Sequence, residues 1–265
     1  MMRRVGIAIV GLMVIAAVVG PWIAPDDPFT QHLSQRQGGM SWRHPLGLDE
    51  LGRDEMARLF AGARLSLLVG VVVVGLSASI GTIVGAVAGY FGGWPDEVIG
   101  RLMDVLLAFP GILLAIALVA MLGPSLSNVI WALVVIGWVG YARLVRGQAL
   151  RVRELDYVQA ARALGGSSAR IILRHAIPAT LPAVIVQGTL GMAGVIIAEA
   201  SLSFLGLGVQ PPAPSWGTMI DAGRSHLFDA PHLTIVPGLA IALVVIGLNF
   251  AGDELRDRID PRKAS

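Results

Sequence analysis

Long runs of apolar residues, each about as long as a membrane is thick, recur along this chain of 265 residues. A helix of roughly 20 apolar residues spans the hydrocarbon core of a bilayer, and one soluble core does not need several such runs. Charged residues make up only 14% of the sequence, whereas a typical soluble domain has roughly 25%. The sequence therefore predicts an all-α protein that crosses a membrane several times.

Six windows are long and apolar enough to cross a membrane as helices. They are Val5–Ala24, Ser66–Phe91, Val105–Leu122, Leu126–Tyr141, Leu181–Ala200 and Leu233–Ala251. The first window, which follows M-M-R-R, could also be read as a signal peptide. Its apolar run is long for a signal sequence and the P-W-I-A-P-D-D after it is a poor cleavage site, so we expect an uncleaved first span.

Glycines recur on one face of the second window, at Gly81, Gly85 and Gly89. Small residues at this spacing let two helices approach closely in lipid. We expect them to serve packing within the helix bundle rather than a specific dimer seam.

Basic residues are unevenly divided between the two sides that six spans define. If both termini share a side, that side holds fourteen of the 20 Lys and Arg residues. Basic connecting segments remain in the cytoplasm, so the bias predicts that both termini are cytoplasmic. The connection between the fourth and fifth spans lies on the same side.

We divide the chain into residues 1–65, with the first span and an extracytoplasmic segment, residues 66–251, with five further spans, and a cytoplasmic tail at 252–265. Just before residue 66, apolar side chains fall on one helical face while acids and arginines occupy the other. The apolar positions are Met56, Leu59, Phe60, Ala63 and Leu67. This pattern predicts an amphipathic helix on the outer membrane surface, with a solvated charged face rather than a binding site.

A second outer segment follows the fifth span and contains Pro211, Pro212 and Pro214, which forbid a continuous helix. Its flanks are apolar, so we expect it to fold back against the bundle at the outer mouth.

Glu199, near the outer end of the fifth span, is the most informative ionisable residue near the membrane. Charges at such positions are rare and have a reason to be there. Two interpretations stay open. Glu199 could line a pathway or contact a docking partner, together with Ser201 and Ser203, or it could bond to nearby backbone or to an arginine.

The connection between the fourth and fifth spans predicts two short helices. Helix-forming residues run from Glu154 to Leu164 and stop at the pair Gly165–Gly166, after which Ser167 or Ser168 can cap a second helix. The first helix carries small residues that would fit a groove of another protein: Ala160, Ala161 and Ala163. An alternative is that the helix rests on lipid headgroups, to which its arginines are attracted. The residues alone do not favour either interpretation.

The motif Q-A-A-R-A-L-G, followed after nine residues by H-A-I-P, resembles a signature of the permease subunits of ATP-binding-cassette (ABC) importers, E-A-A-x-x-x-G-x9-I-x-L-P. The chain has Gln159 instead of the acid, and His175 and Ile177 at the two apolar positions. Segments similar to the peptide and nickel class of these permeases occur elsewhere: His44–Asp54, Gly62–Leu67, Ala198–Gly208 and Gly252–Arg262. The whole resembles the C-type permease subunit of dipeptide or oligopeptide importers.

This resemblance implies the type I ABC importer permease fold, with six transmembrane helices and a cytoplasmic coupling helix at 154–166. The residues that would contact an ATPase are Glu154, Asp156, Gln159, Ala160, Ala161 and Gly165. If docking needs an acid in place of Gln159, Glu154 or Asp156 would supply it.

The resemblance further implies that the chain forms half of a translocation pathway for peptides in a bacterial cytoplasmic membrane. Its partners would be a homologous permease, two ATP-binding subunits, membrane lipid and an extracytoplasmic solute-binding protein that delivers the substrate. Nickel, haem or sugar are alternative substrates, and nucleic acid is not an expected partner.

The sequence argues against catalysis by the chain itself. It has no cysteine and no G-x-x-x-x-G-K-[ST] phosphate loop, and its histidines are scattered. We therefore expect no enzyme activity, metal or cofactor in this chain, with ATP and magnesium held by the partner subunits. An ion-coupled secondary carrier remains the alternative; it would use paired ionisable groups at mid-membrane, where only Glu199 and Asp104 come near.

Overall fold

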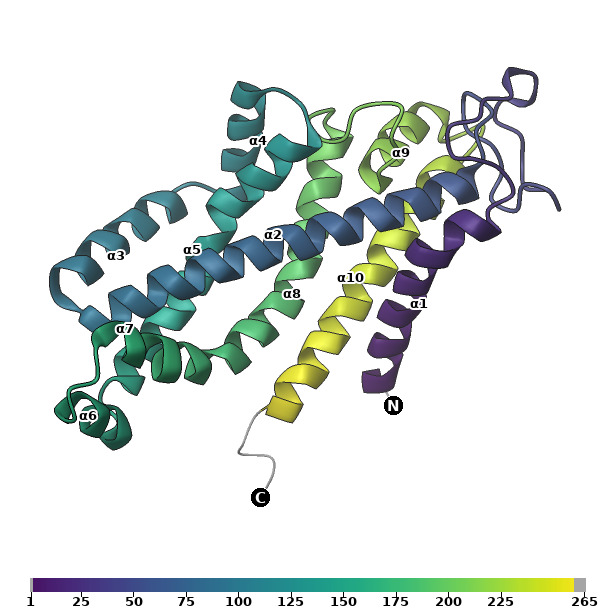
Figure 1. Ribbon diagram of the computed structural model, residues 1–265. Coiled ribbons are helices and arrows are strands. Elements are labelled where there is room, and N and C mark those ends of the chain that lie inside the picture. Colours follow the sequence, from purple (N-terminus) through teal and green to yellow (C-terminus); the bar gives the residue numbers. More distant parts are fainter. Residues whose placement is uncertain (1, 260–265) are drawn as a thin grey trace.

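The computed structural model describes residues 2–259, and all of their longer regular elements are helices (Figure 1). Within these residues, 5 helical runs are long and apolar enough to cross a membrane, or up to 6 if a bent pair counts as one span. The runs are built on α1 (Met2–Ile23), α2 (Glu55–Phe91), α5 (Leu126–Val152), α8 (Ile177–Phe204) and α10 (His232–Ile259). The expected all-helical membrane fold is confirmed.

The third apolar window differs from the single span that we expected at Val105–Leu122. It contains parts of two helices, α3 (Gly93–Leu107) and α4 (Gly111–Leu122), which meet at an angle of 85°. Pro110 lies at the break; it has no amide hydrogen to donate, and it disfavours the helical conformation in the residue before it. Both sides of the break are apolar, so the hydropathy pattern does not reveal it.

The amphipathic helix expected on the membrane surface is not a separate element, because residues 55–65 are the start of α2. Its charged face is only partly solvated, because Arg64 is exposed but two other charged residues are buried. Glu55 and Arg58 are only 2% and 5% exposed, and Arg58 Nε lies 3.4 Å from Asp49 Oδ2. Arg58 therefore joins the segment before α2 to the bundle, whereas Glu55 Oε1 is buried without a hydrogen-bond partner among the described residues.

Residues 24–54 contain one short helix, η1 (Leu33–Gln35), and are held by polar contacts. The Nδ1 atom of His44 lies 2.8 Å from Asp54 Oδ2, and Arg53 Nε donates to Asp49 Oδ2 at 2.6 Å. The His44–Asp54 motif is therefore a folded ionic cluster at the start of α2.

The fifth span begins before Leu181, because α7 (Ser168–Ile171) and the π-helix η2 (Ile172–Ala176) lead directly into α8. The expected cap is confirmed, since Ser167 Oγ accepts a hydrogen bond from the Arg170 amide.

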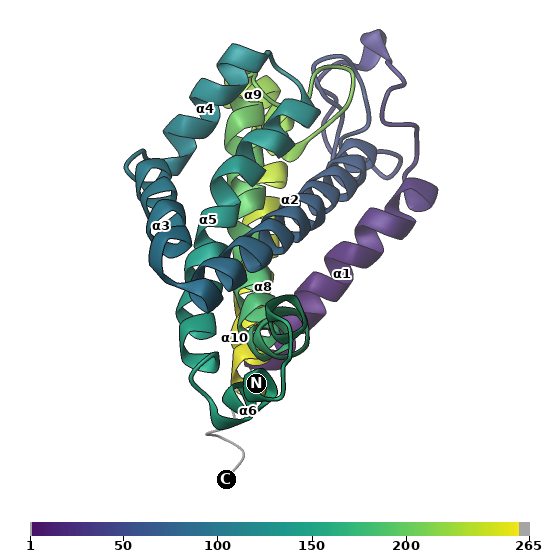
Figure 2. The ribbon, with the colours of Figure 1, turned by 60° about the vertical axis from the view of Figure 1, so that its left-hand side comes forward.

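The two ends of the bundle carry different segments (Figures 1 and 2). The start of α1 and the end of α10 lie at the same end as α6 (Asp156–Ala163) and α7. Residues 24–54 and α9 (Trp216–Gly223) lie at the opposite end. This arrangement agrees with the pattern of basic residues, which requires the connection that contains α6 and both termini to share a side.

The segment rich in proline folds back against the bundle, as expected. Its helix α9 packs against α8 and α10, and Trp216, which is 1% exposed, donates its indole N–H to the Leu59 carbonyl at 3.1 Å. The expected divisions after residues 65 and 251 fall inside α2 and α10. Residues 260–265 of the expected tail lie outside the described residues.

The most extensive contact between two helices joins α2 and α5. Gly81, Gly85 and Gly89 lie in this contact, where a Cβ on any of them would collide with a backbone carbonyl oxygen of α5. These glycines therefore serve packing within the bundle, as expected, and α5 covers the face that a dimer seam would need.

Replacing Gly85 with valine should destabilise the protein, because an added side chain would force α2 away from Ala142 on α5. Overpacking of this kind costs about 1–3 kcal/mol. Thermal unfolding of the protein purified in detergent measures the effect. The matched control is Gly75→Val on the same helix, where no atom lies within 4 Å of the new Cβ; equal losses in both variants would contradict the prediction.

Candidate functional site

Helix α6 projects from the end of the bundle (Figure 1). It begins at Asp156 and is followed by Leu164 and by Gly165, which has a φ of +82°. Glycine adopts this left-handed conformation without a steric penalty. The helix stop predicted at Gly165 is confirmed.

One buried residue of α6, Val158, anchors it to the rest of the chain. Val158 is 2% exposed and belongs to a small apolar cluster with Val152, Ile171 and Ala176. By contrast, Leu155 just before α6, Tyr157 in it and Leu164 just after it are 44%, 51% and 89% exposed. An exposed apolar surface of this kind marks a place where another surface can bind.

The six residues expected to contact an ATPase are accessible, with Ala161 half-buried and the other five exposed. Glu154 Oε1 accepts a hydrogen bond from Arg153 Nε at 2.8 Å, and Gln159 donates to the Arg153 carbonyl at 3.2 Å. Asp156 lies in the first turn, where a negative charge favours the positive end of the helix dipole. Asp156 is therefore an exposed acid at the start of α6 that could take the place of the acid missing at Gln159.

Glu199 lies inside the bundle with none of its surface exposed. Its carboxylate accepts hydrogen bonds from Ser203 Oγ at 2.8 Å and from Ser66 Oγ at 3.2 Å, so it links α8 to α2. It lines neither the cavity of about 280 Å³ nor the cavity of about 350 Å³ that are described below. The contacts favour the interpretation of a structural carboxylate, although its partners are hydroxyls rather than backbone or arginine.

Ser201 has a different environment from Glu199 and Ser203. It lines a cavity of about 350 Å³ with Phe204, Leu205 and other apolar residues of α8, α9 and α10. Its hydroxyl donates to the carbonyl of Ile197 in its own helix at 2.7 Å.

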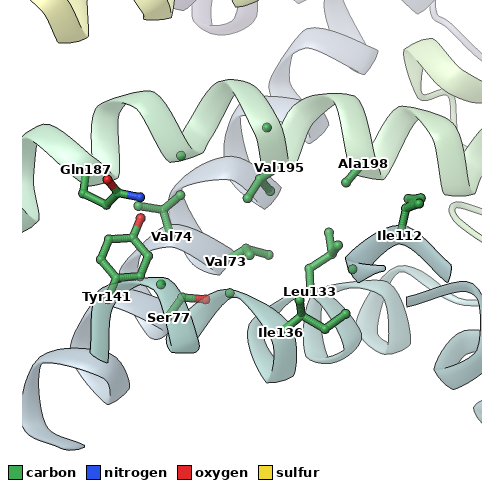
Figure 3. Close-up of a pocket in the computed structure, with 15 residues that line it drawn as sticks. Val73, Val74, Ser77, Ile112, Leu133, Ile136, Tyr141, Gln187, Val195 and Ala198 are labelled. Atoms are coloured by element: carbon green, nitrogen blue, oxygen red, sulfur yellow. The ribbon is translucent and has the colours of Figure 1, made fainter. Parts of the chain in front are cut away.

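A second cavity, here called the central cavity, has a volume of about 280 Å³ and lies among α2, α4, α5 and α8 (Figure 3). Its wall includes Val73, Ser77, Ile136, Tyr141, Gln187 and Val195. These residues lie in the middle parts of α2, α5 and α8, far from both ends of the bundle. Sequence analysis missed the cavity, because valines, glycines and single polar residues in apolar spans carry no distinctive signal.

No group of three or more His, Cys, Asp or Glu side chains within the described part of the chain could hold a metal ion.

A sequence profile of the family described as binding-protein-dependent transport system inner membrane component matches residues 81–265. The chain belongs to this permease family. A second profile, for the N-terminal transmembrane domain of oligopeptide transport permease C, matches residues 2–45 of the permease.

Curated relatives support the same assignment. The permease is 44% identical over 252 residues to the glutathione transport system permease protein GsiD of Shigella dysenteriae serotype 1 (strain Sd197), and the match covers 95% of this chain and 83% of the relative. The GsiD protein of Escherichia coli O157:H7 gives the same identity and coverage.

A solved structure of the methionine ABC transporter MetNI, in inward-facing conformations, matches the permease with a TM-score of 0.62 at 19% identity. The match covers 77% of this chain and 97% of that chain, and it shows the type I ABC importer permease fold. The protein is thus a multi-pass membrane subunit of an ABC importer, which works with a separate ATPase and a binding protein and is not an enzyme. Membership of this family excludes the alternative that the protein is an ion-coupled secondary carrier.

Replacing Glu199 with alanine should destabilise the permease, because Ser66 and Ser203 would lose their buried acceptor. An unsatisfied buried polar group costs about 1–3 kcal/mol. Glu199→Gln, which keeps one acceptor oxygen, should lose less. Thermal unfolding in detergent measures both, with Ser201→Ala as the control; normal stability combined with lost transport in Glu199→Ala would favour the pathway interpretation instead.

Proposed function

We propose that this permease forms half of the peptide pathway of its importer and that α6 couples the pathway to an ATPase. The observation that carries the proposal is the geometry of α6. It offers an exposed surface of small and apolar residues, and it is fixed to the bundle through one buried cluster around Val158.

This cluster connects α6 to two helices at once. Val152 is the last residue of α5, whereas Ile171 and Ala176 belong to the helical run that continues into α8. Both α5 and α8 line the central cavity. A force applied to α6 by an ATPase would therefore reach two walls of the cavity, since close-packed interiors transmit displacement.

The proposal places α6 and both termini in the cytoplasm of a bacterial cell, as the pattern of basic residues indicates. Two ATP-binding subunits would hold ATP and magnesium and would bind α6 of this chain and the corresponding helix of a homologous permease. The binding protein would dock at the opposite end, where residues 24–54 and α9 lie. Apolar side chains on the outside of α1, such as Leu12 and Ile15, would contact lipid.

A peptide substrate is supported by two comparisons. The relatives with 44% identity are named glutathione permeases, and the profile at residues 2–45 is that of an oligopeptide permease. We therefore propose a short peptide, of the size of a dipeptide or tripeptide, as the transported substrate.

Leu164→Glu should abolish binding of the ATPase and its stimulation by the binding protein. Leu164 makes no buried contact in this chain, so the new charge would be buried only when α6 docks. Co-purification of the ATPase subunits with the permease measures docking, and ATP hydrolysis in the reconstituted transporter measures coupling.

The matched control is Leu33→Glu, at an exposed leucine in the opposite end of the bundle. It should leave ATPase binding unchanged. Normal ATPase binding and full uptake in Leu164→Glu would overturn the assignment of α6.

A further inference from the structure

Three hydrogen-bonding groups in the wall of the central cavity have no partner. Within residues 2–259, no hydrogen bond forms to the hydroxyls of Ser77 and Tyr141 or to the side-chain amide of Gln187. Ser77 is 1% exposed and Tyr141 is 5% exposed, whereas Gln187 lies at the exposed edge of the cavity. Polar groups at such buried positions normally have partners, so the cavity presents unused hydrogen-bonding capacity.

The three groups lie toward one end of the cavity (Figure 3). Gln187 and the Tyr141 hydroxyl are close to each other, with Ser77 beside them, and Val195 and Ile112 lie farther along. The cavity therefore has a polar part and an apolar part, which suits a ligand with an amide group next to an apolar group.

The chemistry of the wall favours an uncharged group. The residues that line the cavity include no Asp, Glu, Lys, Arg or His. A hydroxyl and a carboxamide can each donate and accept, which matches the N–H and C=O of a peptide bond. A charged ammonium or carboxylate would lose its hydration here without meeting an opposite charge.

The break between α3 and α4 borders this cavity. Gly111 and Ile112, the first residues of α4, belong to the cavity wall. Just before them, Phe109 is 56% exposed. Within a membrane, non-helical backbone is tolerated only where protein buries it or where it borders a water-filled space.

We propose that the central cavity is a transit subsite for an uncharged backbone amide of the substrate. Ser77, Tyr141 and Gln187 bind the amide, and the side chains of Val73 and Val195 hold the apolar group next to it. The volume of about 280 Å³ lies near the lower limit for ligand pockets, roughly 300 Å³, so the subsite holds part of a peptide rather than all of it. This inference rests on the proposed function and adds which part of the substrate the permease recognises.

The test uses the complete transporter in liposomes, with the partner permease, the ATPases and the binding protein. The probes are alanyl-glycine and alanyl-sarcosine, which differ only by a methyl group on the amide nitrogen. Uptake of each probe is measured for the wild type and for Ser77→Ala, Tyr141→Phe and Gln187→Leu. The preference for alanyl-glycine should fall about two- to tenfold in the variant that removes the acceptor of the amide N–H, as expected for one hydrogen bond.

The matched control is Ser79→Ala on α2, whose hydroxyl donates to the Gly75 carbonyl of its own helix at 2.8 Å. It should keep the preference of the wild type. Tyr141→Phe removes a single oxygen atom and should not disturb assembly of the transporter. It can therefore still test the subsite if Gln187→Leu fails to assemble. An unchanged preference in all three cavity variants would overturn the subsite, because discrimination would then lie in the binding protein.

ATP hydrolysis separates this inference from the proposed function. A wild-type transporter that responds to its binding protein but takes up neither probe would overturn the amide subsite and the peptide class, and would leave the role of α6 intact. No response to the binding protein would contradict the proposed function itself, together with the subsite that depends on it.

Discussion

The close approach of α2 to α5 is the contact on which the rest of the structure depends. Gly85 on α2 meets the backbone of α5 at a distance that no other residue would permit. In lipid, where apolar side chains gain little by leaving their surroundings, such close backbone packing is a main source of helix association. The same two helices form two walls of the central cavity, so the packing that stabilises the bundle also shapes its interior.

The α6 surface and the central cavity share two helices, α5 and the run that ends in α8. Val158 holds α6 against residues from the end of α5 and from the run leading into α8. Both helices continue into the cavity wall. In the proposed mechanism, movement imposed at α6 would change the space between these helices, because closely packed interiors transmit displacement. Glu199, hydrogen-bonded to Ser66, adds a polar link between α8 and α2.

Much of the fold and of the α6 surface could be predicted from the sequence. The spans followed from apolar length, and the end of α6 followed from Gly165, because these features depend on neighbouring residues. Three features could not be predicted in this way. The 85° bend at Pro110 lies inside an apolar window. Glu55 lies beside Asp49, Met219 and Leu233, which come from three separate segments of the chain. Glu199 accepts a hydrogen bond from Ser66, which belongs to a different helix.

The sequence by itself determined that the chain is a helical membrane protein, and its motifs indicated a permease with a docking helix. Both are encoded locally, by apolar length and by the spacing of small residues and glycines along the chain. Only the tertiary structure decided which polar groups are satisfied and which are free. Ser66 and Ser77 look alike in sequence, yet one bonds to Glu199 and the other lies unpartnered among the described residues, in a cavity wall. That difference arises because hydrogen bonding depends on which helices pack together, a relation between distant residues that no local pattern records.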